Sequence, residues 1–79
     1  MSWSYHVAGD AAVAIRRLDV EAQEAVFDAL EDLLTEVEDV DDGEFNHLVY
    51  FQTDGGITAI SMSLFASSGS RVLILLDVG

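Results

Sequence analysis

Residues 19–37 read DVEAQEAVFDALEDLLTEV, and this stretch decides the fold of the chain. Its apolar residues recur three or four positions apart, which is typical of an α-helix with one buried face. They are Val26, Leu30, Leu33, Leu34 and Val37. Asp19 precedes them as a candidate N-cap, since its carboxylate can accept a hydrogen bond from the first turn. The pattern predicts an amphipathic helix.

The acidic residues of this helix mostly lie away from the apolar stripe, so we expect them on an exposed outer face. They are Glu21, Glu24, Asp28, Glu31 and Asp32, followed by Glu36. Residues 19–37 contain no Lys or Arg, and like charges three or four positions apart cost a few tenths of a kcal/mol each. The helix must therefore depend on tertiary packing. The first five of these residues form the candidate partner-binding face.

The chain before this helix predicts two shorter elements. Residues 3–7 alternate with large or β-branched side chains, which favours a short strand. We expect Gly9 and Asp10 to end it, and Asp10 to cap a first helix from Ala11 to about Leu18.

After the long helix, the sequence changes from a helical to a strand period. Residues 38–44 (EDVDDGE) are too polar to bury and predict an exposed acidic loop. Residues 45–52 and 57–65 are rich in β-formers and flank an Asp-Gly pair, which is typical of a tight hairpin. Residues 67–70 (SSGS) predict a further turn, and residues 71–78 contain VLILL, a run apolar on both faces that predicts a central strand.

These elements predict a single α+β domain over residues 1–79 with the order β-α-α-β-β-β. The simplest packing places two helices on one face of a four-stranded antiparallel sheet. The strand at 57–65 alternates apolar residues with serines, so one sheet face should meet the core and the other water or a partner. A chain of 79 residues is near the small end of what folds without metal or disulfide staples.

The charge of the chain limits its function. It has 15 acidic residues against three Arg and no Lys, and its net charge is −12. Twelve of the acidic residues lie between Asp19 and Glu44, a stretch without Lys, Arg or His. Affinity for nucleic acid comes largely from basic residues, so direct nucleic-acid binding is not expected. Three explanations of the charge stay open: a halophilic milieu, a docking face for a basic protein partner, or mimicry of nucleic acid.

Several classes of site and location are not expected. The chain has no Cys, and its longest apolar run, residues 72–76, is far shorter than the roughly 20 residues of a spanning helix. The N-terminus lacks the charged and apolar parts of a signal peptide. We therefore expect a cytoplasmic protein that does not contact membranes. The acidic loop lacks the spacing of an EF-hand, so neither a metal nor a cofactor is expected.

Three features resemble the RelE/ParE superfamily of small bacterial and archaeal toxins, with its plasmid-stabilisation-like fold. They are the order of the elements, the Arg16-Arg17-Leu18-Asp19 junction followed by EAQEAVFDALEDLL, and the terminal VLILLDVG. The resemblance covers most of the chain. It implies a toxin of a type II toxin-antitoxin pair; some members cut ribosome-bound messenger RNA, and others act on DNA gyrase.

The chain departs from that family where the chemistry would lie. Messenger-cutting members carry basic residues on the sheet and commonly a basic or His residue with a Tyr after the last strand. Here the middle strands present Ser and Thr, and the sequence ends in Asp-Val-Gly where that tail would begin. RNA cleavage without a metal needs proton transfer and positive charge. Only His47 and Arg71 form a candidate toxin-like site, so no catalytic residue is assigned.

Two hypotheses follow. We favour a small, acidic, non-catalytic protein-protein interaction module on a RelE/ParE-like scaffold. Its docking surface would be the acidic helix, the serine-bearing sheet face or a free strand edge at residues 45–52 or 3–7. A homodimer formed through such an edge would shield it. The alternative is a divergent toxin that acts by protein contact or RNA cleavage.

Overall fold

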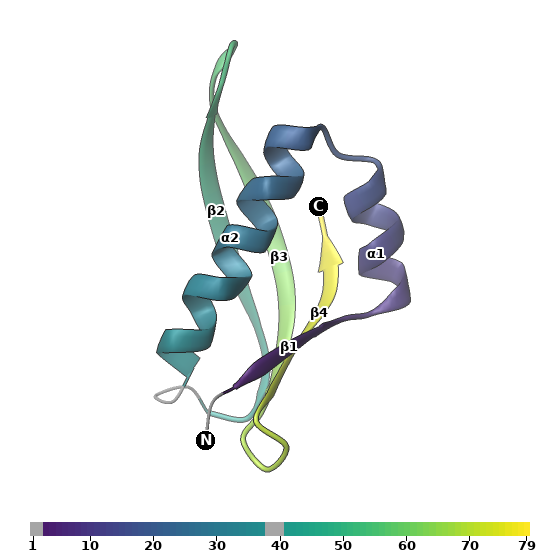
Figure 1. The fold of residues 1–79 in the computed structure, drawn as a ribbon, viewed down its shortest axis with the longest axis vertical. Helices are drawn as coiled ribbons and strands as arrows, with labels where there is room; N and C mark the ends of the chain where they lie inside the picture. The colour runs from purple at the N-terminus through teal and green to yellow at the C-terminus, as the bar shows by residue number, and fades with distance from the viewer. Residues whose placement is uncertain (1–2, 38–40) are drawn as a thin grey trace.

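The computed structural model describes residues 3–37 and 41–79. Its elements are β1 (Ser4–Val7), α1 (Gly9–Arg16), α2 (Val20–Glu36), β2 (Gly43–Thr53), β3 (Gly56–Ser67) and β4 (Val72–Val78). The strands form one sheet in the order β1-β4-β3-β2, and α2 crosses in front of it (Figure 1). The shortest dimension of the molecule is 18 Å, which fits two layers about 10 Å apart and leaves no room for a third.

The predicted two helices and four-stranded sheet are confirmed, but the sheet is mixed and the prediction of an antiparallel sheet was wrong at β1. This strand pairs in parallel with β4, whereas the β4–β3 and β3–β2 pairs are antiparallel. A single residue, Ala8, connects β1 to α1, and its amide still donates a hydrogen bond to the Leu75 carbonyl at 3.0 Å. So short a connection does not reverse the chain. Consequently α1 leads on from the end of β1 and only α2 runs back, as Figure 1 shows.

The helix ends differ from their predicted caps. Helix α1 begins at Gly9 with Ala8 in the N-cap position, so Asp10 lies in the first turn. There its charge meets the positive end of the helix dipole instead of capping the helix. Asp19 does occupy the N-cap position of α2, but its side chain makes no capping hydrogen bond.

Gln23 makes a contact that fixes the junction between the two helices. Its Nε2 donates hydrogen bonds to the carbonyls of Ile15 and Leu18, both at 3.0 Å. Ile15 lies in the last turn of α1, where its carbonyl also accepts the Leu18 amide at 3.0 Å, and Leu18 lies two residues beyond the helix. Carbonyls at a helix end need such partners from outside the helix. A side chain of α2 therefore completes the end of α1 and holds the helices in their relative places.

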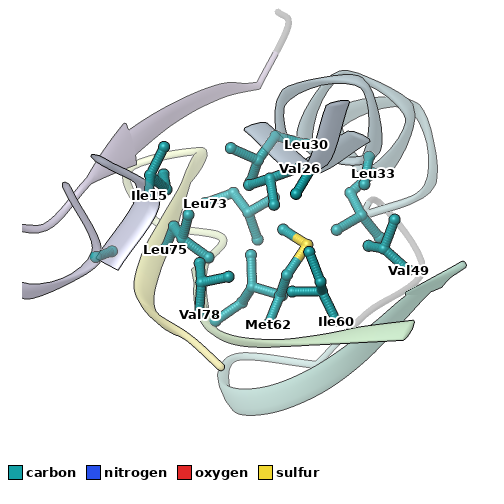
Figure 2. Packing of buried hydrophobic residues seen from close by; sticks show 14 of the residues in the cluster. Ile15, Val26, Leu30, Leu33, Val49, Ile60, Met62, Leu73, Leu75 and Val78 are labelled. Atoms are coloured by element: carbon teal, nitrogen blue, oxygen red, sulfur yellow. The ribbon is translucent and has the colours of Figure 1, made fainter. Parts of the chain in front are cut away.

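The core lies between the helices and the inner face of the sheet (Figure 2). In β3, the predicted alternation is confirmed: Ile60, Met62 and Leu64 are buried, while Ser61 is exposed. Strand β4 lies between β1 and β3, which confirms its predicted central place. Figure 2 shows Met62 of β3 and Leu73 of β4 facing the side chains of α2, and Leu75 of β4 beside Ile15 of α1. Among the described residues, every buried side chain is apolar, so polar chemistry is restricted to the surface.

The acidic loop after α2 is shorter than predicted at its far end. Strand β2 already begins at Gly43, so Gly43 and Glu44 belong to the sheet, while Asp41 and Asp42 are exposed and precede it. Residues 38–40 of the predicted loop lie outside the described residues. The predicted tight hairpin is present as a two-residue turn between Thr53 and Gly56. The left-handed backbone needed to close it falls on Gly56, whose φ is 119°.

Candidate functional site

A groove of about 430 Å³ runs between α2 and β2. One wall is formed by residues 47–51 of β2, all of which line it. Consecutive strand residues point to opposite faces of a sheet, so five consecutive lining residues mean that the groove borders the edge of the strand. The helix supplies an apolar wall through Ala25, Ala29 and Leu33. The site therefore combines a strand edge with one side of a helix.

Three carboxylates line the helical side of this groove. Asp28, Asp32 and Glu36 stand four residues apart, so they form one stripe along α2. All three are exposed. Residues 19–37 contain no basic residue, so no cation of the helix itself neutralises the stripe. The groove therefore favours positively charged groups.

Strand β2 is an outermost strand of the sheet. It pairs with β3 from Gly43 to Thr53 without a shift in register, and within residues 3–37 and 41–79 no strand pairs with its other edge. Edge strands are usually protected by Lys, Pro, a bulge or short length. The 11-residue β2 has none of these devices, whereas β1 at the opposite edge has only four residues. Strand β2 is therefore the edge better suited to accept an added strand.

The structure divides the predicted partner-binding face of α2. Asp28 and Asp32 line the groove beside β2, where Glu36 joins them. Glu21 lines a different groove of about 490 Å³, between the α1–α2 junction and the β2–β3 hairpin. Glu24 and Glu31 are exposed and line neither of these two grooves. The predicted partner-binding face did not include Glu36. Its position four residues after Asp32 places it on the same side of the helix and could have indicated that it belongs there.

The two residues of the toxin-like alternative are not brought together. His47 lines the α2–β2 groove and lies opposite Met62, which in turn lies opposite Val78 at the end of β4. Arg71 lies just before the start of β4, with a φ of 52°. The length of β4 therefore separates the two residues by about 20 Å along the sheet. The toxin alternative stays a prediction.

Two further findings concern the described residues alone. Within residues 3–37 and 41–79, no three His, Asp or Glu side chains are grouped so as to hold a metal ion. Neither α1 nor α2 combines the length and the apolar character that crossing a membrane requires.

Comparison with known proteins finds no family model and no curated protein that matches the chain. The resemblance to the RelE/ParE superfamily therefore stays a prediction. What the fold itself defines is a two-layer α+β domain with a mixed sheet, one long free strand edge and an acidic helix beside it.

Proposed function

We propose that this protein is a non-catalytic protein-protein interaction module that binds an extended basic segment of a partner in the groove between α2 and β2. The observation that supports it is that one groove combines a stripe of three carboxylates with a strand edge that no other described strand pairs with. An extended segment can add to such an edge through backbone hydrogen bonds, while its side chains provide specificity.

The spacing of the three carboxylates along α2 matches the spacing of alternate residues along a strand, so it suits a segment with basic residues at alternate positions. Alternate side chains of a strand lie on one face about 6.6 Å apart. Helix residues four positions apart are separated by about 6.0 Å along the axis. Three alternate Lys or Arg residues of an added strand would thus face Asp28, Asp32 and Glu36. Exposed ion pairs contribute only about 0.2–1 kcal/mol each, so the backbone pairing supplies affinity and the charges supply preference.

The test is a binding titration with a fluorescent peptide of about ten residues that alternates Lys and Val. We expect the wild type to bind it more tightly than a matched peptide of Glu and Val. The triple variant D28N/D32N/E36Q should bind the basic peptide about tenfold more weakly, since three weak ion pairs are lost. The control E21Q/E24Q/E31Q removes the same charge from α2 outside this groove and should change the affinity less than about twofold.

Two results would contradict the proposal. An equal loss in both triple variants would mean that the peptide senses only the overall negative charge. Binding that survives N-methylation of every peptide amide would mean that no strand is added at β2, because methylated amides cannot donate backbone hydrogen bonds along either edge of the peptide. Amide NMR shifts at residues 47–51 upon titration identify the edge directly.

A further inference from the structure

The outer face of the sheet, opposite the helices, carries exposed apolar side chains between serines and amides, and no element of the described residues covers it. Residues paired across neighbouring strands point to the same face, so the register assigns its members. Its large or apolar members include Leu48, Tyr50, Ile57, Ala59, Phe65 and Ile74, and its polar members include Asn46, Gln52, Ser61, Ser63 and Ser67. Leu48, Tyr50 and Ile57 are 54%, 66% and 78% exposed. These three side chains are neighbours across β2 and β3, and an exposed apolar cluster rimmed by polar residues is typical of an interaction site.

The shape of the outer face is self-complementary, because large and small side chains lie side by side on neighbouring strands. Tyr50 lies opposite Ala59 and Leu48 lies opposite Ser61, so large side chains on β2 stand beside small ones on β3. On the other side of β3, Gly79 exchanges two backbone hydrogen bonds with Ser61, at 3.0 and 2.9 Å, and adds no side chain there. A ridge at Leu48 and Tyr50 thus borders a shallow valley at Ala59 and Ser61, in the middle of β3. Across a twofold axis, the ridge of one copy fits the valley of the other.

The small number of charges on the outer face also favours a second copy of the chain as its partner. Among the described strand residues, the register places only two carboxylates there, Glu44 and Asp77, together with His6, although the chain has 15 acidic residues. A basic partner would find little to attract it, and an anionic membrane would repel a chain of net charge −12. A second copy offers the same apolar side chains and uncharged serines, with few charges. In a face-to-face pair, the two α2 axes would lie about 30 Å apart, since each layer is about 10 Å thick. That is several times the Debye length of about 8 Å at physiological salt.

The size of the face is sufficient for a dimer. The strands contain 4, 11, 12 and 7 residues, which gives a flat footprint of about 540 Å² from a rise of about 3.3 Å and a spacing of about 4.8 Å. Standing side chains increase the accessible area beyond this footprint. The face thus approaches the roughly 800 Å² that each partner contributes to a standard interface. We infer that a second copy of this chain covers the outer sheet face, giving a dimer with α2 on both outer sides.

Sedimentation equilibrium of the full chain tests this inference. We expect the wild type at micromolar concentration to have twice the chain mass of 8.6 kDa. The variant L48K/Y50K should dissociate at least about 100-fold more readily, because it places two ammonium groups in the interface core. It also lowers the net negative charge, so a change in overall repulsion would act in the opposite direction. The control V13K/V20K makes the same change at exposed apolar residues of the two helices and should leave the dimer intact.

A second variant separates face-to-face packing from pairing at the β2 edge. Ala59 is exposed on β3, which is not an edge strand, and it does not line the α2–β2 groove. Ala59→Lys should therefore dissociate the dimer without affecting the binding of the basic peptide. The inference is overturned if the wild type is monomeric, or if the dimer survives A59K. Because peptide binding is measured separately, failure here leaves the proposed function standing, and the reverse also holds.

Discussion

The side chain of Asp42 links the segment before β2 to the turn between β3 and β4. Its Oδ1 accepts a hydrogen bond from the backbone amide of Ser68 at 2.8 Å, across 26 positions of the sequence. Hydrogen bonds from the side chain and then the backbone of Ser68 lower the pKa of Asp42 below its ordinary value of 3.8, because both stabilise the charged carboxylate. The contact holds the start of β2 against the turn between β3 and β4.

The lowered pKa of Asp42 makes a prediction about pH. The stability that its carboxylate contributes is present above 3.8 and is lost as the pH falls through the folded-state pKa, which lies below 3.8. We expect Asp42→Asn to lower the Tm near pH 7 and to lower it less near pH 2, because the wild-type carboxyl is increasingly protonated as the pH falls. Thermal melts of both proteins at the two pH values measure this difference. Asp41→Asn removes the same charge from the neighbouring exposed residue and serves as the control; an equal Tm loss for D42N at both pH values would contradict the prediction.

At the scale of the element, α2 carries a repulsion that one substitution can reverse. Asp32 stands four residues from both Asp28 and Glu36, and like charges at this spacing destabilise a helix by about 0.2–0.5 kcal/mol per pair. Asp32→Lys turns two repulsive pairs into attractive ones. We expect the free energy of unfolding to rise by about 1 kcal/mol at low salt and by less in molar NaCl, where surface charges are screened. Urea denaturation at the two salt concentrations measures both values.

The intermediate variant Asp32→Asn separates the two contributions, since it removes repulsion without adding attraction. It should give about half of the gain, and no gain in either variant would contradict the argument. Asp32→Lys also places a positive charge in the middle of the acidic stripe. If the groove binds basic segments, this variant should be more stable than the wild type and yet bind the Lys-Val peptide more weakly. The same substitution at position 32 would then raise the stability of the fold and lower the affinity for the peptide.

The elements that could be predicted from sequence are those whose pattern is local. Helix α2 repeats its apolar spacing over several turns, and β3 alternates cleanly, so each needs no knowledge of its neighbours. The direction of β1 could not be predicted in the same way. Four residues carry no signal for their partner, and the parallel pairing follows from how Ala8 directs the chain into α1. The groove was missed for a related reason: the sequence identified acidic residues on α2 but not that residues 47–51 lie beside them.

At the scale of the whole molecule, charge and apolar surface are separated. The acidic stripe of α2 borders one groove, while the outer sheet face carries few charges and several exposed apolar side chains. The two proposed surfaces therefore differ in chemistry, and they meet at Leu48 and Tyr50, which stand on the outer face and also border the groove. One face can bind a second copy while the groove of each copy binds a basic segment. Three Arg residues cannot neutralise 15 carboxylates, so the assembled molecule remains strongly negative.

This imbalance predicts that salt stabilises the fold. Raising NaCl from about 0.01 M to 1 M shortens the Debye length from roughly 30 Å to 3 Å, which screens the repulsion between exposed carboxylates. We expect the Tm to rise with NaCl, and to rise less in E21Q/E24Q/E31Q, which carries three fewer charges. NaCl is used instead of sulfate because sulfate also strengthens apolar burial.

Association must be separated from folding in this experiment, because the Tm of a dimer depends on protein concentration. Melts of Ala59→Lys, in which the outer face cannot pair, isolate the response of the single chain. A rise in A59K equal to that of the wild type assigns the effect to self-repulsion within the fold and supports adaptation to a salt-rich milieu. A flat Tm in A59K means that packing already offsets the repulsion, so the acidic stripe imposes little cost on folding, and its charge is better explained by a basic partner in the groove.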